Sequence, residues 1–483
     1  MKKSLITAAV LGASAMLNAW IVPGAKVFPA DSTPTITIRA QTDAEKQLLA
    51  EGELYYLSGS ATWSDGEYRR GPAPRWEKPK VEKTADTIRV KIKLRGEDNH
   101  YFRLAKFGEL PYKGPHVRLQ GKMIPAFLPG YAQFRFYTLK PDLMKLRPWK
   151  GDIHQHSIRC GHAKEPPHRI PAFGRRAGFD YLSLSEHKLH KPSLEAIEAN
   201  NNADAGMRAF PAEEFHTAPA FLHAVAVGHT QGVNEWVAAH PQEFEKRWKE
   251  EVGNPEYDPY GMNKFEREMI AKARVMYRIA HNECQAKLVS YCHPADQNPS
   301  DLTDAPPRRY RQAMMDLFEY DAMELFNAAQ YGGLVRMSLV HAMAMEQIAK
   351  GRKFGFVSVS DCHRQADHPL YGKFFTVIFA KDCQVDDFAD AVKNRMSIAA
   401  RTRITADPKD NKSQYLYYGP ARLMCYQQFL DAVYWPYHDK LCREQGELML
   451  KLADGDESVR PEIAKLKKAI EDYRKVFFFS PKK

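Results

Sequence analysis

Two histidines separated by a single residue end a short stretch of the chain, Lys150-Gly151-Asp152-Ile153-His154-Gln155-His156. In an extended segment the side chains alternate between two faces, so both imidazoles point to the same side and can bind one ion. The triplet Asp361-Cys362-His363 repeats this spacing with a carboxylate and an imidazole. It follows the stretch from Phe354 to Ser360, which we predict to be a buried strand.

Further histidines lie at the ends of predicted strands. His187 follows the run from Tyr181 to Ser185, and His293 ends the run from Lys287 to Cys292. The carboxyl ends of parallel strands open on one face of an α/β barrel, and catalytic sites assemble there. His223 begins its run instead, so either it reaches this face from the start of its strand or the predicted boundary of that strand is wrong.

The histidines are concentrated in one part of the chain. Of the 18 histidines, fifteen lie between His154 and His368, a span of less than half of the chain, so their clustering needs a cause. Between residues 148 and 405 short apolar runs alternate with helical stretches, which predicts parallel strand pairing in an α/β barrel or a layered sheet. The predicted strands here also include 223–228 and 322–326, and the predicted helices are 193–200, 265–283 and 334–350.

The flanking segments have a different character. Residues 34–145 are predicted to form a β-rich, sandwich-like accessory domain, because 35–39, 88–94 and 131–139 are alternating or aromatic runs between proline and glycine turns. Residues 420–483 are predicted to be a helical C-terminal extension. We interpret its charged stretch 460–476 as a helix that packs against the barrel, with docking of a partner as the alternative.

Length and composition restrict the class of protein. The chain has 483 residues, of which 44% are apolar and 27% are charged, which excludes a wholly disordered, collagenous or polytopic membrane protein. Roughly two to three domains are expected. The net charge of +11 is interpreted as a solvated surface or as attraction to an anionic substrate. No basic block is typical of nucleic-acid binding.

The first 25 residues are predicted to be a signal peptide. Lys2 and Lys3 precede the uncharged stretch 4–25, which holds a short apolar run and then small residues. Export to the periplasm or the extracellular space is therefore expected, and an N-terminal membrane anchor is the alternative. The chain has 7 cysteines, and an odd number leaves at least one thiol unpaired or bonded to another chain.

Motifs in this order resemble those of the polymerase and histidinol phosphatase (PHP) superfamily. The stretch from Gly151 to Ser157 resembles its first motif, and the stretch from Pro171 to His187 resembles its second. Residues 211–215, with Glu213 and Glu214, resemble the segment that supplies a bridging glutamate. Later motifs resemble 223–228, 290–294, 323–327 and 360–363, so that the resemblance covers about 150–370.

The resemblance implies a distorted (β/α)7 barrel that holds two to three divalent transition-metal ions, Zn²⁺, Mn²⁺ or Fe²⁺. It implies hydrolysis of a phosphomonoester or phosphodiester by a metal-activated water. Glu214 is preferred to Glu213 as the bridge, and Glu324 and Asn327 are expected outside the ligand set. The implied ligands are His154, His156, His162, His187, Glu214, His223, His293, Asp361 and His363.

Cations and thiols beside the motifs have further candidate roles. Arg159, Lys164, Lys188 and Arg364 could neutralise phosphoryl charge or could be ordinary surface charges; Arg364 and Lys188, with Asp361, are our candidate catalytic residues. Cys160, Cys292 and Cys362 could ligate a soft metal or could be buried apolar residues. Strand alternation predicts that Cys292 and Cys362 face away from the metals.

The sequence therefore predicts an exported metal-dependent phosphoesterase. Its substrate would be a phosphorylated small molecule or an envelope-associated molecule, and no membrane span is expected beyond the leader. The alternatives are an amidohydrolase-like metal hydrolase, which normally has a bridging modified lysine or carboxylate and one late aspartate, and a metal-binding surface protein without catalysis.

Overall fold

The computed structural model describes residues 20–58, 77–105, 131–216, 223–294, 308–328, 334–402 and 416–478. The chain divides into two compact units. The first consists of Met1–Leu146, Tyr426–His438 and Lys468–Lys483, and the second of Arg147–Cys425 and Asp439–Lys467. All 7 cysteines are free thiols. Among the described residues, no helix combines the length and the apolar character that crossing a membrane requires.

The first unit contains two small sheets that share one hydrophobic core. Ile38 and Ile88 of one sheet and Phe102 and Phe136 of the other belong to the same buried cluster. One sheet has the order β1 (Val27–Pro29), β7 (Tyr131–Leu139), β6 (Asn99–Ala105), β3 (Glu53–Ser58), and the other β2 (Thr35–Arg39), β5 (Thr87–Lys91), β4 (Val81–Lys83). The short helices α2 (Asp43–Glu51) and α3 (Pro141–Met144) also belong to this unit, as do the helical segments within Tyr426–His438 and Lys468–Lys483.

The predicted leader falls partly outside the described residues, which begin at Trp20. Trp20 itself is buried, and its ring meets that of Phe134 edge-on at 5.9 Å. Ile21 donates a backbone hydrogen bond to Arg39 at 2.9 Å. Trp20 is thus part of the packed core of the first unit, and the half-buried Ile21 is joined to it by backbone hydrogen bonds.

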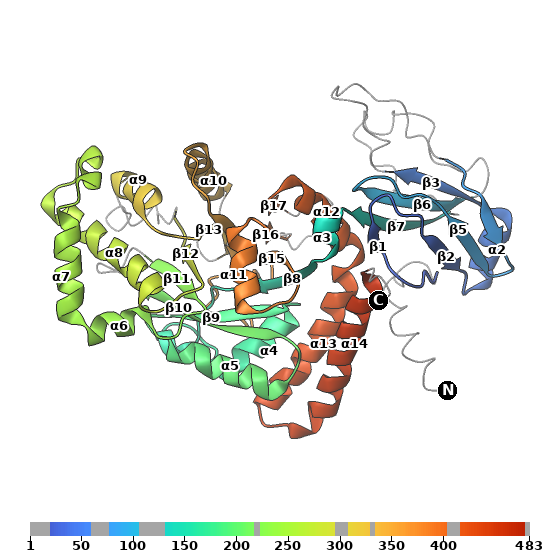
Figure 1. Cartoon of the computed structure of the whole chain (residues 1–483). Helices are drawn as coiled ribbons and strands as arrows, with labels where there is room; N and C mark the ends of the chain where they lie inside the picture. The colour runs from blue at the N-terminus through green and yellow to red at the C-terminus, as the bar shows by residue number, and fades with distance from the viewer. Residues whose placement is uncertain are drawn as a thin grey trace. The chain divides into compact units, whose positions relative to one another are not determined.

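In the described part of the second unit, ten strands form one sheet (Figure 1). Its order is β14 (Gly355–Val359), β13 (Ala322–Asn327), β12 (Leu288–Tyr291), β11 (His223–Val227), β10 (Arg208–His216), β9 (Tyr181–His187), β8 (Arg147–Asp152), β15 (Phe374–Ala380), β16 (Ser397–Arg401), β17 (Leu416–Tyr418). Hydrogen bonds also link the edge strand β14 to strands beyond β8. The backbone N–H of Ser358 donates to the hydroxyl of Thr376 in β15, and this hydroxyl donates to the carbonyl of Ser358. The hydroxyl of Ser358 donates to the carbonyl of Ala400 in β16 at 2.7 Å. The sheet is therefore a nearly closed barrel.

Strand direction departs from the predicted all-parallel pairing. β8, β9 and β10 are parallel to one another, as are β12, β13 and β14, but β11 is antiparallel to both of its neighbours. The meander β15–β16–β17 also joins β8 in the antiparallel sense. The cause at β11 is chain length: six residues separate His216 from His223, whereas a parallel crossover needs roughly a dozen or more.

Helices connect the strands of the second unit. The three predicted helices are confirmed as α5 (Lys191–Ala203), α8 (Lys264–Asn282) and α10 (Leu334–Ala349). The prediction did not include α6 (Val233–Ala239), which has only 7 residues, or α7 (Pro241–Val252), in which charged residues predominate. The remaining helices of the described barrel are α4 (Ile170–Arg176), α9 (Arg308–Leu317) and α11 (Val385–Lys393).

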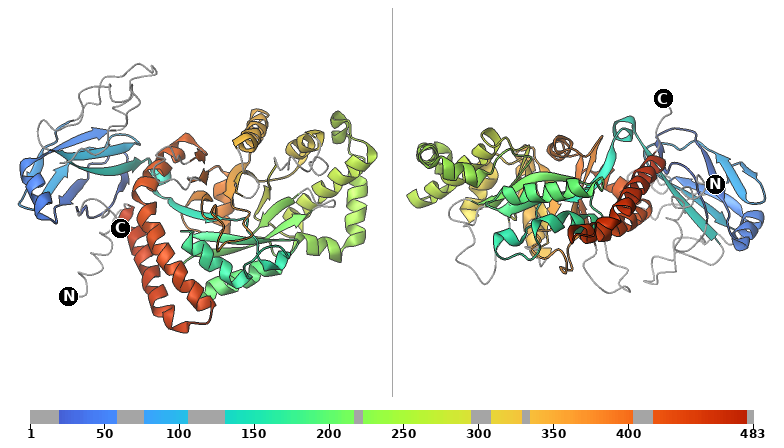
Figure 2. Two further views of the ribbon diagram at one scale, coloured as in Figure 1. Left: turned by 180° about the vertical axis from the view of Figure 1, so that it is seen from behind. Right: turned by 90° about the horizontal axis from the view of Figure 1, so that it is seen from below.

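The C-terminal extension is helical, as predicted, and part of it packs on the barrel (Figure 2). It consists of α12 (Ala421–Val433), α13 (Trp435–Ala453) and α14 (Arg460–Phe477). Gln445 of α13 accepts a hydrogen bond from Arg175 of α4 at 2.6 Å and donates to the carbonyl of Ile463 of α14 at 3.0 Å. Asp439 of α13 pairs with the buried Lys150 of β8 at 2.6 Å.

The contact between α4 and α13 depends on a glycine. A Cβ atom at Gly446 would lie 2.3 Å from the backbone nitrogen of Arg176. We predict that Gly446→Ala lowers the free energy of unfolding by about 1–3 kcal/mol, as overpacking does. In the interior of a helix, alanine is otherwise about 1 kcal/mol more favourable than glycine. A loss of stability in this variant would therefore have to come from the packing of the two helices.

Thermal and denaturant unfolding would measure this change, with Gly253→Ala as the control. Gly253 follows α7 with φ −77°, and the nearest atom to its added Cβ would be 3.7 Å away, so this variant should be nearly neutral. Equal stability of the two variants would contradict close packing of α4 and α13.

Candidate metal centre

Buried donor groups gather at the mouth of the barrel where the parallel strands end. β9 ends at His187, and Glu214 lies two residues before the end of β10. His154 and His156 follow β8, His293 follows β12, and Asp361 and His363 follow β14. His223 reaches the same place as the first residue of the antiparallel β11, which confirms the expectation that it enters from the start of its strand.

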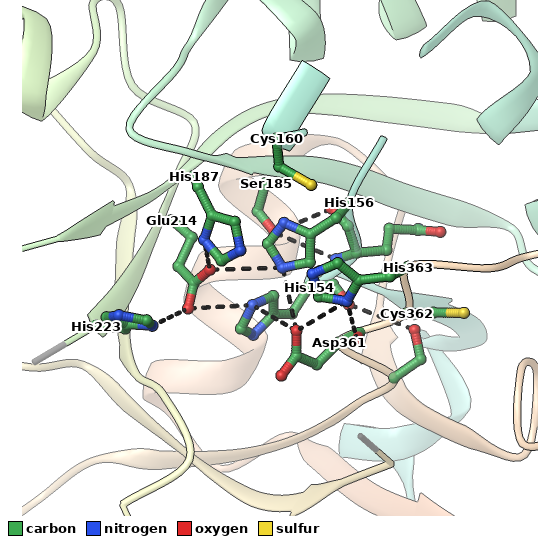
Figure 3. Close-up of polar contacts among 12 residues, drawn as sticks. His154, His156, Cys160, Ser185, His187, Glu214, His223, Asp361, Cys362 and His363 are labelled. Atoms are coloured by element: carbon green, nitrogen blue, oxygen red, sulfur yellow. Dashed lines mark hydrogen bonds and ion pairs between the residues drawn. The ribbon is translucent and has the colours of Figure 1, made fainter. Parts of the chain in front are cut away.

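The first donor group combines two imidazoles with two carboxylates. The Nε2 atom of His154 lies 3.4 Å from Glu214 Oε1 and 3.5 Å from Asp361 Oδ1. The Nε2 atom of His156 lies 3.4 Å from Glu214 Oε2 and 3.1 Å from Asp361 Oδ1. Both imidazoles therefore point at the same carboxylates, as the spacing of the two histidines predicts (Figure 3).

A second donor group shares Glu214 with the first. His187, Glu214, His216 and His223 present donor atoms that all lie within 4.8 Å of one another. Glu214 Oε2 lies 2.6 Å from His187 Nδ1, and Glu214 Oε1 lies 2.9 Å from His223 Nδ1. His293 Nε2 also approaches Glu214 Oε1, at 3.3 Å. The carboxylate of Glu214 is thus common to both groups.

A third group forms the outer rim of the site. Cys160, His162, His187 and His363 present donor atoms within 4.8 Å of one another. The exposed ring of His162 stacks at 4.5 Å on that of His363. Cys160 belongs to the short 3-10 turn η4 (Ile158–Cys160) after the first motif. All nine predicted metal ligands therefore lie in one neighbourhood.

Strand alternation distinguishes the two adjacent glutamates. Glu214 faces the donor groups, whereas Glu213 accepts backbone hydrogen bonds from Val233 at 2.5 Å and Asn234 at 3.1 Å at the start of α6. Burial raises the pKa of Glu213 to about 7 despite these bonds. Glu213 therefore anchors a helix, and Glu214 is the residue that several ions could share.

Other carboxylates hold the imidazoles from behind. Glu324 Oε1 lies 2.6 Å from His154 Nδ1, and Asn327 donates to Glu324 Oε2 at 3.0 Å. Glu186 Oε1 lies 3.4 Å from His156 Nδ1, and its other oxygen accepts from the backbone of Ser157 at 2.9 Å. Such partners orient ligating histidines and raise their basicity. Glu324 and Asn327 lie outside the ligand set, as expected.

The two cysteines next to ligands differ in orientation. The sulfur of Cys362 accepts from the backbone of Arg364 at 3.4 Å and points away from the imidazoles, as predicted (Figure 3). The expectation for Cys292 is wrong, because its sulfur lies within 4.8 Å of His154 and Glu324 donor atoms. The reason is that β12 ends at Tyr291 and His293 has φ +27°, so strict alternation no longer applies there.

A cavity of about 630 Å³ opens over these groups. Of the four candidate cations, Arg159 and Lys188 are among its described lining residues. Lys164 and Arg364 instead pair with Asp367, at 3.7 and 2.7 Å, and Arg159 also pairs with Glu195 at 2.9 Å. The described lining is completed by Cys160, His162, His187, Glu214, His216, His223, His293, Asp361 and His363.

Electrostatic interactions are strong because the carboxylates are buried. Burial opposes protonation of His154, but the charges of Glu324, Asp361 and Glu214 raise the pKa of this imidazole well above its usual value. Burial would raise the pKa of Asp361, but His154 and His156 lower it below its usual range. At the periphery, burial lowers the pKa of His216 and of His363 to about 4 in each case. The inner carboxylates thus require positive charge, and the outer imidazoles are neutral donors.

The donor set fits divalent transition metals. Nitrogen and carboxylate donors suit Zn²⁺, Mn²⁺ and Fe²⁺. His154 Nε2 and His363 Nε2 are buried atoms without a hydrogen-bond partner among the described residues, although each faces the cluster of donors. Orphaned buried polar atoms are costly and call for an ion or an ordered water.

Sequence reasoning missed His216. It lies two residues after Glu214 on β10, so strand alternation alone puts both side chains on one face. The motif resemblance does not include this position, and the end of β10 could not be located from the sequence. The pattern Glu-x-His was the available signal.

No protein-family model and no curated protein sequence matches this chain. Among solved structures, one similar chain is assigned as a metal-dependent phosphoesterase from Bifidobacterium adolescentis, with 14% identity and a TM-score of 0.30 over 45% of this chain and 88% of that chain. Another is an amidohydrolase from Chromobacterium violaceum with bound sulfate and no metal, with 15% identity and a TM-score of 0.28 over 44% and 88%. These likenesses are too distant to assign a reaction.

Opposite sides of one loop provide a test of the donor set. We predict that Asp361→Asn lowers the affinity for Zn²⁺ at least tenfold, because it removes a negative charge from the first donor group; even residues behind a ligand typically contribute about 10- to 100-fold. Cys362→Ala should retain the metal content of the wild type. Elemental analysis after dialysis measures both. Equal losses in the two variants would show that the loop is oriented the other way.

Proposed function

We propose that this chain is an exported metal-dependent phosphoesterase with a PHP-type barrel. The observation that supports this most strongly is the carboxylate of Glu214, which is common to two donor groups of imidazoles. A shared carboxylate is the arrangement that holds two ions close together, as in hydrolases that act on phosphoesters. We propose two to three ions, held by the nine predicted ligands.

The chemistry divides between the ions and the chain. Divalent ions bound here would polarise a phosphoryl oxygen and lower the pKa of a water molecule. Lys188 and Arg159 line the cavity and would bind the phosphoryl oxygens. Lys188 is held by its backbone, which donates to the carbonyl of Glu214 at 3.0 Å in a left-handed conformation with φ +59°. This fixes the start of its side chain beside the shared carboxylate.

The late motif favours phosphoester over amide hydrolysis. The amidohydrolase alternative expects one late aspartate, whereas here both Asp361 and His363 join a donor group with His156. The volume of the cavity suits a small phosphorylated molecule or the exposed head of a larger one.

An assay with two chromogenic substrates tests the proposal. Protein loaded with Zn²⁺ or Mn²⁺ should hydrolyse p-nitrophenyl phosphate, bis(p-nitrophenyl) phosphate or both, and chelation should abolish this hydrolysis while circular dichroism stays unchanged. Hydrolysis that persists in metal-free protein would contradict the proposal. Cleavage of amide substrates alone would favour the amidohydrolase alternative.

The cations at the cavity provide a sharper prediction. Lys188→Ala should raise KM about tenfold or more without changing the metal content, because a charge-assisted hydrogen bond contributes about 1.5–3 kcal/mol. Arg364→Ala should have the smaller effect, since Arg364 is exposed and bonds Asp367 through two nitrogens. Steady-state kinetics with elemental analysis compares the two. A larger rise in KM in Arg364→Ala than in Lys188→Ala would indicate that Arg364 is the main phosphate-binding cation.

We also propose that the leader is removed ahead of Trp20, because Trp20 is packed in the core of the first unit. Intact-mass analysis of protein from the native host should then show a chain that begins at or shortly before Trp20. Retention of the residues that precede it would support the anchor instead. A mass lacking Trp20 as well would show that its packing is dispensable.

A further inference from the structure

We propose that His216 is an additional metal ligand, which completes a subsite of four protein donors with His187, Glu214 and His223. This inference rests on the proposed metal-dependent function and deepens it. One of the ions would then have four protein ligands and no open position, whereas the ions held by the remaining donors would keep one.

The position of His216 in the sheet brings its ring to this subsite. His187 is the register partner of Glu214 across β9 and β10, and His216 is the register partner of His223 across β10 and β11. Because Glu214 and His216 are two residues apart on β10, they share one face. Three neighbouring strands thus present the four donors side by side.

The four side chains lie close enough together to converge on one ion. His216 Nε2 lies 2.7 Å from His187 Nδ1 and 3.8 Å from Glu214 Oε2. Its ring is stacked on that of His223 at 3.7 Å, with an interplanar angle of 11°, so one of the two rings must turn for both nitrogens to point at one ion. One donor atom from each of the four residues lies within 4.8 Å of the other three.

The backbone of His216 is held on both sides by one residue. Its N–H donates to Asn234 Oδ1 at 3.0 Å, and its carbonyl accepts from Asn234 Nδ2 at 2.9 Å. Asn234 is itself fixed at the start of α6, where its backbone donates to Glu213. The backbone of His216 is therefore held in place, although it stands at the end of its strand.

Four protein donors have a functional consequence. Zinc with four protein ligands keeps no open position, whereas catalytic zinc keeps one for water or substrate. We expect the ion at His216 to be held firmly and to organise Glu214. The ion at His154 and His156 would then be the one that is open to the cavity.

Release of Zn²⁺ to the chromogenic chelator 4-(2-pyridylazo)resorcinol tests this inference. The full chain is loaded with Zn²⁺ and dialysed, and the released equivalents and their rates are measured. In the wild type, one equivalent should be released most slowly. In His216→Ala, this equivalent should be lost or released at least tenfold faster, while the other equivalents are unchanged. His168→Ala, an exposed histidine outside the donor groups, is the control.

A pair of near-isosteric variants separates ligation from hydrogen bonding. His216→Asp offers a new anionic donor and should restore the slow equivalent, whereas His216→Asn should not. Wild-type release in His216→Asn, or unchanged release in His216→Ala, would overturn the inference and leave the proposed function standing. If the wild-type protein binds no Zn²⁺, Mn²⁺ or Fe²⁺, both fail. If His216→Ala does not fold, the Asp and Asn variants decide.

Discussion

The buried carboxylate of Glu214 is the group around which the mouth of the barrel is organised. Oxygen atoms of Glu214 lie between 2.6 and 3.8 Å from nitrogen atoms of six imidazoles, those of His154, His156, His187, His216, His223 and His293. Burial of an anion is costly unless cations or hydrogen bonds compensate for the lost water. Without an ion, protons on the inner imidazoles must supply the positive charge, and their raised pKa values reflect this demand.

Residues on both faces of strand β10 help to position the donors. On β10, Glu214 and His216 point to the donors, while Glu213 points away and accepts the N–H groups at the start of α6. α6 in turn supplies Asn234, which holds the backbone of His216. The reversal of β11 has the same effect, because only an antiparallel strand brings its first residue to the mouth.

Much of this arrangement could be predicted from the sequence because its parts are local. The pair His154 and His156 and the pair Asp361 and His363 each need only two-residue alternation, and the strand ends needed only apolar runs. Contacts between distant segments were harder to predict. Arg364 was predicted to bind phosphate because it follows His363, but it pairs with Asp367. The turn at His293 brings Cys292 toward His154, although alternation predicted the opposite. His216 required knowledge of where β10 ends.

Anomalous diffraction from crystals of the metal-loaded protein, at the absorption edge of the bound metal, tests the central claim most directly. The account predicts two or three peaks at the barrel mouth, with the two oxygens of Glu214 bonded to different ions. A single peak that Glu214 does not touch, or no peak among these imidazoles in crystals soaked with Zn²⁺ or Mn²⁺, would contradict it.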